Sequence, residues 1–186
     1  MKDEILITEF ELRLLGEVLW KFLIKKLNRK LNRLFYLNTK KDLREVEKIT
    51  FCFENYPVPE FKYQGKTTTV SQYINQKPTT QAVWLAVDKT YWIVFTVIWK
   101  RISISSVNKL LNFLLHELVH HACFIFGWEN NDGSKDFEEI LEFIGAPSNL
   151  GQQRHKYINF AQEILFHQIC DILNLDYSEN NWGEIH

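Results

Sequence analysis

The feature that most constrains this chain is an apolar segment that carries three histidines. Within residues 105–128, His116, Glu117 and His120 form the pattern H-E-x-x-H, and His121 follows directly. On an α-helix, residues four apart lie on the same face. His116 and His120 can therefore present two imidazole nitrogens to one metal ion, whereas His121 points about 100° away.

The residues around this pattern predict a helix that is mostly buried. Ser105 or Ser106 is suited to cap its first turn, and Gly127 is suited to end it. Histidines and a glutamate are costly inside a buried helix unless they are paired or bound to a metal, so the context favours a metal site over a chance match. The apolar positions lie on more than one side of the helix: Val107, Leu110, Leu111, Leu114, Leu115, Leu118 and Val119.

The spacing indicates a particular kind of metal chemistry. A catalytic zinc site has three protein ligands and one open position. Glu117 lies one step round the helix from His116, where its carboxylate can reach a metal-bound water and act as general base in the hydrolysis of a carbonyl compound. We expect the third ligand in the acidic sequence downstream, with Asp132 as the first candidate and Asp136, Glu138, Glu139 and Glu142 as alternatives.

Composition sets outer limits on the class of protein. The 186 residues suit one domain, and a hydrophobic content of 46% excludes a disordered chain. Cys52, Cys123 and Cys170 are far apart and include no C-x-x-C, which argues against a disulfide framework and for reduced thiols. The apolar run 90–99 is too short to span a bilayer, and the N-terminus is a poor signal peptide. We therefore expect a cytoplasmic protein that does not enter a membrane.

Helical periodicity is predicted at both ends of the chain. Residues 8–38 carry apolar side chains at helical spacing and indicate one or two helices. After the central helix, residues 135–144 predict a further helix, with Ser134 as its cap, and residues from about 153 to 173 predict a last one. These helices bracket the central part of the sequence.

Between them, a period of two indicates strands. Residues 49–53 alternate as a half-buried strand does, and residues 82–87 and 91–99 are strand candidates joined by a reversal at Asp88-Lys89. Residues 67–70 form a possible edge strand. We therefore expect an α+β fold with N-terminal helices, a small antiparallel sheet packed on the H-E-x-x-H helix, and C-terminal helices.

The N-terminal helical segment is basic, because residues 19–41 contain several lysines and arginines and no acidic side chain. A basic amphipathic helix can contact nucleic acid, here through Lys21, Lys25, Arg29 and Arg33, although many charged faces are only solvated. This observation gives the alternative hypothesis: a non-catalytic, metal-stapled module of a mobile element that binds DNA or protein.

The segment from Leu114 to His121, followed by Asp132-Gly133-Ser134-Lys135-Asp136-Phe137, resembles the core of SprT-like (Spartan-type) zinc metallopeptidases. The resemblance covers residues 49–145 and implies a zincin-like fold, one Zn²⁺ and a protein or peptide substrate. That family typically has a histidine as third ligand. Here no histidine lies between His121 and His155, and Asp132-Gly133 is the nearest counterpart. The zinc ribbon common in the family is absent, as in its small phage and mobile-element members.

These observations combine into one hypothesis, a zinc-dependent peptidase. We expect His116, His120 and Asp132 to hold Zn²⁺ and Glu117 to act as general base and then acid. His155 and Tyr157 are candidates to stabilise the oxyanion, although both could equally be packing or surface residues. We expect a single domain made of a basic helical part (1–45), a sheet and metal-site core (46–145) and a C-terminal helical part (146–186). Substrate preference, DNA dependence and oligomeric state stay open.

Overall fold

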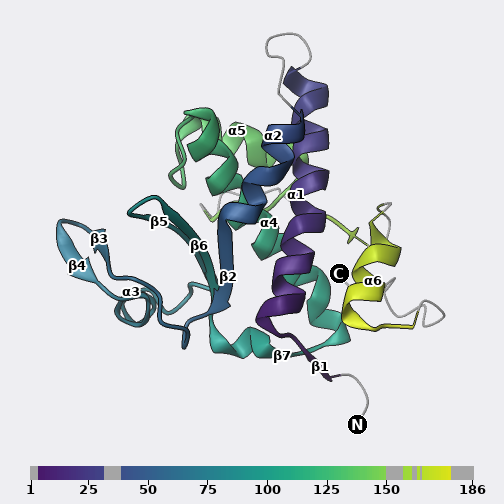
Figure 1. Cartoon of the computed structure of the whole chain (residues 1–186), viewed down its shortest axis with the longest axis horizontal. Helices are drawn as coiled ribbons and strands as arrows, with labels where there is room; N and C mark the ends of the chain where they lie inside the picture. The colour runs from purple at the N-terminus through teal and green to yellow at the C-terminus, as the bar shows by residue number, and fades with distance from the viewer. Residues whose placement is uncertain (1–3, 32–38, 150–156, 161–162, 164, 177–186) are drawn as a thin grey trace.

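The computed structural model describes residues 4–31, 39–149, 157–160, 163 and 165–176, and it combines helices with small sheets, which confirms the expected α+β class. Figure 1 shows the arrangement. The helices are α1 (Glu9–Leu31), α2 (Thr39–Arg44), α3 (Val70–Gln76), α4 (Val107–Phe126), α5 (Lys135–Ile144) and α6 (Phe166–Leu173). The strands are β1 (Glu4–Leu6), β2 (Ile49–Phe53), β3 (Phe61–Tyr63), β4 (Lys66–Thr68), β5 (Ala82–Val87), β6 (Thr90–Phe95) and β7 (Arg101–Ser103). Short 3-10 helices are η1 (Glu45–Lys48), η2 (Val97–Lys100) and η3 (Ile104–Ser106).

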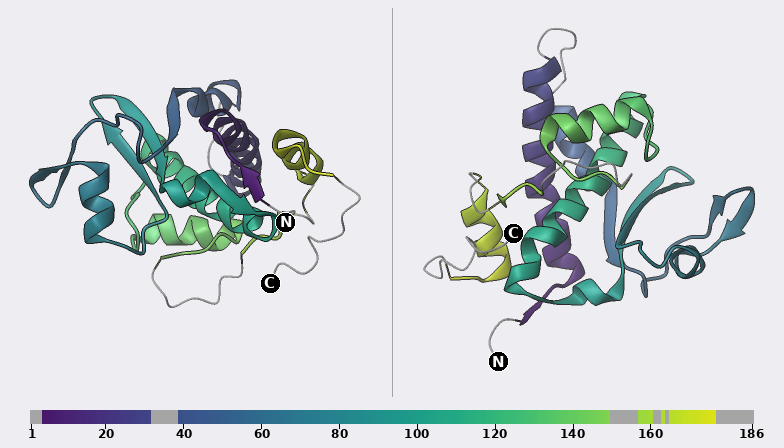
Figure 2. Two further views of the ribbon diagram at one scale, coloured as in Figure 1. Left: turned by 90° about the horizontal axis from the view of Figure 1, so that it is seen from below. Right: turned by 180° about the vertical axis from the view of Figure 1, so that it is seen from behind.

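Helices α1 and α4 form the centre of the molecule, where they pack on each other, and α1 also packs on β2 (Figure 2). Helix α1 begins with a capping box: the Glu11 N–H donates to Thr8 Oγ1 and the Thr8 N–H donates to Glu11 Oε2. All seven apolar positions predicted for α4 are buried, and the described ones predicted for α1 are buried too: Leu12, Leu15, Leu19, Ile24 and Leu27. The rest of the predicted 8–38 segment lies outside the described residues.

The prediction that Ser105 or Ser106 caps α4 is wrong. The 3-10 turn η3 leads directly into the helix, and Ser106 already has helical backbone angles. Its hydroxyl lies 2.9 Å from Ser103 Oγ and makes no capping bond. The 3-10 turn thus takes the place of a serine cap at the start of the helix.

The sheet beside these helices is mixed, which corrects the expectation of an antiparallel sheet. Its strand order is β2-β6-β5, with β2 parallel to β6 and β5 antiparallel to β6. The chain leaves the sheet after β2 and returns at its far edge as β5. The hairpin then inserts β6 between them, so β2 and β6 run the same way.

The β5–β6 hairpin is predicted well by the sequence. Strand β5 has the expected bounds, and Asp88 and Lys89 have φ values of 48° and 65°. Two consecutive residues with positive φ make the type of two-residue turn whose twist suits a hairpin. Strand β6 is shorter than the predicted 91–99, because the chain turns into η2 after Phe95.

The excursion between β2 and β5 forms a small lobe, defined here as β3, β4 and α3, which lies beside the sheet and away from α1 in Figure 1. The predicted edge strand 67–70 is only partly correct, because β4 ends at Thr68. Thr69 and Gln72 make reciprocal side-chain to backbone bonds, which start helix α3 at Val70.

Helix α5 has the predicted bounds, although the side chain of Ser134 makes no capping bond. The predicted helix 153–173 is too long, because α6 begins only at Phe166. The described residues 157–160 form no α-helix, since their backbone bonds to α4 instead. The Ile158 N–H donates to Asn112 Oδ1 and the Phe160 N–H donates to Asn108 Oδ1.

Candidate metal centre

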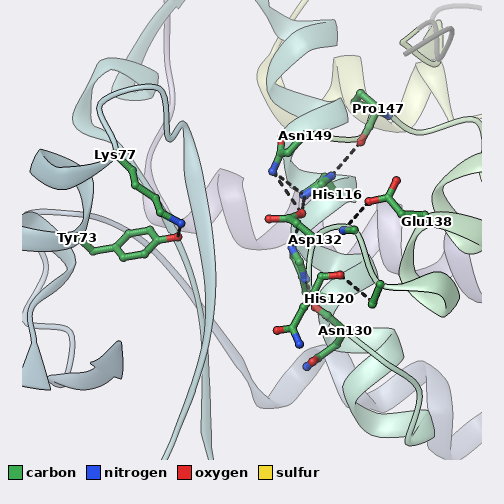
Figure 3. A network of polar contacts seen from close by, with 12 residues as sticks. Tyr73, Lys77, His116, His120, Asn130, Asp132, Glu138, Pro147 and Asn149 are labelled. Carbon is green, nitrogen blue, oxygen red and sulfur yellow. Dashed lines mark hydrogen bonds and ion pairs between the residues drawn. The ribbon is translucent and has the colours of Figure 1, made fainter. Parts of the chain in front are cut away.

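His116 and His120 lie one turn apart on α4 and point to the same place, as Figure 3 shows. Their Nε2 atoms are 3.2 and 3.6 Å from one oxygen of Asp132, which comes from the loop between α4 and α5. Ligand atoms of His116, Glu117 and His120 all lie within 4.8 Å of one another. The motif on α4 and a carboxylate from the following loop therefore converge.

The other nitrogen of each ring is held by a backbone carbonyl. His116 Nδ1 is 2.9 Å from the Pro147 oxygen, and His120 Nδ1 is 2.6 Å from the Asn130 oxygen. A carbonyl can only accept, so each Nδ1 carries the proton and donates it. When a ring is neutral, its lone pair is then on Nε2, directed at the shared point. Metal-binding histidines usually have a partner of this kind, which fixes the tautomer and the ring orientation.

Two glycine-terminated helices bring these carbonyls into position. Gly127 and Gly145 follow α4 and α5 with φ values of 72° and 82°, a conformation that glycine adopts without steric cost. In each case the next residue donates back into the last turn, Trp128 to the Cys123 oxygen and Ala146 to the Leu141 oxygen. The chain therefore reverses sharply after each helix and returns to the histidines.

Phe137 and Asn149 complete the surroundings of the two rings. Phe137 is fully buried and stacks on His120, with centroids 4.1 Å apart and planes at 18°. Asn149 Nδ2 lies 3.2 Å from His116 Nε2 and 3.4 Å from Asp132 Oδ1. Asn149 could not be predicted as part of the site, because its only local signal in the sequence is a turn-forming segment after Gly145.

Among the acidic candidates for a third ligand, Asp132 is the one beside the histidines. Its pKa is lowered, because the hydrogen bond from His116 and the charges of both histidines outweigh the effect of burial. The remaining candidates make other contacts or face solvent: Asp136 and Glu138 accept from backbone N–H groups at 3.0 and 2.9 Å, Glu139 lies 4.0 Å from Lys135, and Glu142 is exposed.

Glu117 is buried next to this group and makes a contact of its own. Burial raises its pKa to about 7, and Asp132 adds to the rise, while His116 and a hydrogen bond from the Trp84 backbone N–H oppose it. Trp84 belongs to β5, so the carboxylate joins the helix to the sheet. No regular spacing links residues 84 and 117, so this interaction could not be predicted from the sequence.

The pKa values of the two histidines are shifted in opposite directions. Burial and the charge of His116 lower the pKa of His120 to about 4, although Asp132 opposes them. Burial also lowers the pKa of His116, but the hydrogen bond and charge of Asp132 and the charge of Glu117 leave it above its usual value. His120 therefore favours the neutral form, with a lone pair on Nε2, whereas His116 favours the protonated form, whose Nε2–H donates to Asp132.

His121 is fully buried and faces away from this group, as its position on the helix predicts. It contacts the rings of Trp20, Trp84 and Tyr91. Burial lowers the pKa of His121 to about 4, so the ring is neutral near neutral pH.

A cleft of about 1340 Å³ opens over the histidines. Edge strand β5 runs along it, and the lobe forms its far side. Tyr157, one of the two oxyanion candidates, lines the cleft and packs edge-on against Phe113, with centroids 6.3 Å apart. The other candidate, His155, lies outside the described residues.

The proposed nucleic-acid surface is only partly described. Lys21 and Lys25 are exposed on α1, while the side chain of Arg29 and the whole of Arg33 lie outside the described residues. Within the described ranges, no helix is both long enough and apolar enough to cross a bilayer.

Comparisons of the chain with protein-family models, with curated proteins and with solved structures found no match.

Proposed function

We propose that this chain is a metal-dependent peptide hydrolase in which His116, His120 and Asp132 hold one zinc ion. One observation carries the proposal: both Nε2 atoms approach the same Asp132 oxygen, at 3.2 and 3.6 Å, in an open cleft. Two imidazoles and one carboxylate match the ligand set of catalytic zinc sites. The carbonyl partners of both Nδ1 atoms also suit a metal, because they keep the Nε2 lone pairs available.

When bound here, a zinc ion supplies Lewis acidity, which polarises a peptide carbonyl and makes water acidic enough to lose a proton near neutral pH. The chain supplies the base. The Glu117 carboxylate accepts the proton from the attacking water and returns it to the nitrogen of the departing amine. The Trp84 backbone N–H lowers the pKa of this carboxyl group, which favours the ionised form that can act as base.

The edge of β5 is the surface that we assign to the substrate backbone. In the described sheet, β5 pairs only with β6, and its other edge borders the cleft. An extended peptide can add to such an edge through main-chain hydrogen bonds. This pairing would align a scissile bond beside Glu117, and Tyr157 in the same cleft is the proposed donor to the oxyanion.

Hydrolysis of a fluorogenic unfolded protein tests this function. The parent protein is prepared with one zinc ion per chain and compared with Glu117→Gln, which keeps shape but cannot take a proton. We expect the variant to lose at least about a hundredfold in rate, within the range for general base catalysis, and to keep its zinc. Glu142→Gln, an exposed carboxylate on α5 that does not line the cleft, is the matched control. Equal rates for parent and Glu117→Gln would exclude the proposal.

The same zinc-loaded protein also tests the alternative hypothesis, a non-catalytic module that binds DNA or protein. Four protein ligands to the metal, no hydrolysis, and tight salt-sensitive binding of single-stranded DNA would favour it. In that case a Lys21→Gln and Lys25→Gln double variant should bind DNA more weakly and with a smaller salt slope.

A further inference from the structure

Residues of both charge signs line the cleft. The histidine side contains the carboxyl groups of Glu117 and Asp132. The lobe side contains aromatic rings and lysines from β3, from α3 and from the residue that follows α3: Phe61, Lys62, Tyr63, Tyr73 and Lys77. In Figure 3, Lys77 and Tyr73 lie on the opposite side of the view from the histidines. Lys109 of α4 and Glu60, the residue before β3, line the cleft as well, so each side carries both signs of charge.

Lys77 is held in place by two tyrosines, and we call these three residues the Lys77 cluster. Its ammonium nitrogen lies 3.3 Å from Tyr73 Oη and 5.0 Å from the ring centroids of both Tyr63 and Tyr73. The rings are perpendicular, with centroids 4.9 Å apart. Such packing restricts a side chain that is normally very mobile, so less entropy remains to be lost when an anion binds.

The charge of this ammonium group is not neutralised by an acid. Among the described residues, no carboxylate lies within 4.0 Å of Lys77, in contrast to Lys48, which lies 2.8 Å from Glu45. Hydroxyl groups and ring faces satisfy the ammonium only in part, because a charged donor binds most strongly to a charged acceptor. The cluster is therefore a preorganised cation that faces a cleft.

We infer that the Lys77 cluster is a subsite for an acidic side chain of the peptide, several residues from the bond that is cut. This inference rests on the proposed function, since it assigns a substrate class to that cleft. A peptide fits better than a nucleic acid for two reasons. The β5 edge along the cleft offers backbone groups to an extended chain, and the cleft also contains Glu60, Asp88, Glu117 and Asp132, which would repel a polyphosphate.

Peptide binding to the zinc-loaded Glu117→Gln protein tests the subsite. A neutral, fluorescently tagged peptide is scanned with Glu, Gln or Lys at each position, and affinity is read by fluorescence polarisation. At one position we expect Glu to bind about three to five times more tightly than Gln, the range for an exposed charge pair. Adding Lys77→Met should bring this ratio to about one, and adding Lys77→Glu should favour the Lys peptide. Lys66→Met, on the same lobe but not lining the cleft, should leave the ratio unchanged.

Failure of the subsite can be distinguished from failure of the proposed function. A Glu-to-Gln ratio near one at every position, or a preference that survives Lys77→Met, would overturn the subsite. So would a single-stranded oligonucleotide that binds in a Lys77-dependent manner where acidic peptides do not. Because the readout is binding, a parent protein that hydrolyses nothing would count against the proposed function alone.

Discussion

The indole N–H of Trp84 donates a 3.3 Å hydrogen bond to Nδ1 of His121, which ties edge strand β5 to helix α4. The same indole lies nearly parallel to the His120 ring, at 14° with centroids 6.2 Å apart. The Trp84 backbone N–H also acts on the Glu117 carboxyl group, whose pKa it lowers. His121, which points away from His116 and His120, therefore holds strand β5, which lies beside those two histidines.

Replacing His121 with Phe should loosen this connection. The phenyl ring fills most of the space but cannot accept a hydrogen bond. We expect a loss of about 1 kcal/mol in the free energy of unfolding and a fall in kcat/KM for peptide hydrolysis of about tenfold, with zinc affinity unchanged. Urea denaturation, kinetics and competition with a chelator measure the three quantities.

A double-variant cycle identifies the cause. If His121 acts through Trp84, His121→Phe should have little further effect on kcat/KM in a Trp84→Phe background. Trp92→Phe is the control, because that indole donates to Thr90 on its own strand. Additive losses in the cycle would show that His121 acts by another route.

Asp132→Asn should weaken metal binding. The amide keeps the shape of the side chain but removes the negative charge beside both Nε2 atoms. We expect zinc affinity to fall by at least about tenfold, because loss of a group that only supports a ligand already costs that much and Asp132 is a proposed ligand itself. Competition with a colorimetric chelator measures it. Glu139→Gln on α5, which is 4.0 Å from Lys135, serves as control. Parent-like affinity in Asp132→Asn would assign the third ligand to another residue.

Glu117→Gln should stabilise the metal-free protein, and increasingly so at higher pH. The folded-state pKa of Glu117, about 7, lies above the value of about 4.3 in an unfolded chain. The folded protein therefore retains a proton that the unfolded chain has lost, and this contribution to stability disappears as pH rises through about 7. The glutamine does not titrate. The stability difference between variant and parent should grow by about 2 kcal/mol from pH 5 to pH 8.

Denaturant titrations with a chelator present, at several pH values, measure this difference. Glu142→Gln, which removes an exposed carboxylate, should differ from the parent by an almost constant amount. A pH-independent difference for Glu117→Gln would show that the carboxyl group is solvated in the folded protein.

Asn112→Leu should destabilise the fold more than most single changes. The Asn112 amide is fully buried, donates to the carbonyls of Asn108 and Ile158, and accepts from the Ile158 N–H. Leucine has a similar size but leaves the Ile158 groups unpaired and buried, at a cost of about 2–4 kcal/mol. Urea denaturation and hydrogen exchange at the Ile158 amide measure the loss. Asn75→Leu on the exposed face of α3 should change stability by less than about 0.5 kcal/mol.

Much of the fold was predictable where the signal is local. The bounds of α5 and β5, the burial of α4 and the turn at Asp88-Lys89 all follow from patterns within a few residues. The predicted helix 153–173 fails for the opposite reason: α4 asparagines bond the backbone at Ile158 and Phe160 from a distance in sequence. The parallel pairing of β2 with β6 likewise depends on where the lobe returns the chain.

The features of the site also fall into those that local spacing predicts and those that depend on distant segments. Local spacing alone predicts that two imidazoles and a carboxylate share a buried helix, because a helical repeat places residues four apart on one face. Packing between distant segments determines which acid meets them, which carbonyls fix their tautomers, and how β5 contacts Glu117. Those partners are Asp132, Pro147, Asn130 and Trp84, which come from loops and a strand. Their positions depend on how the helices end and pack, and no short-range periodicity encodes that.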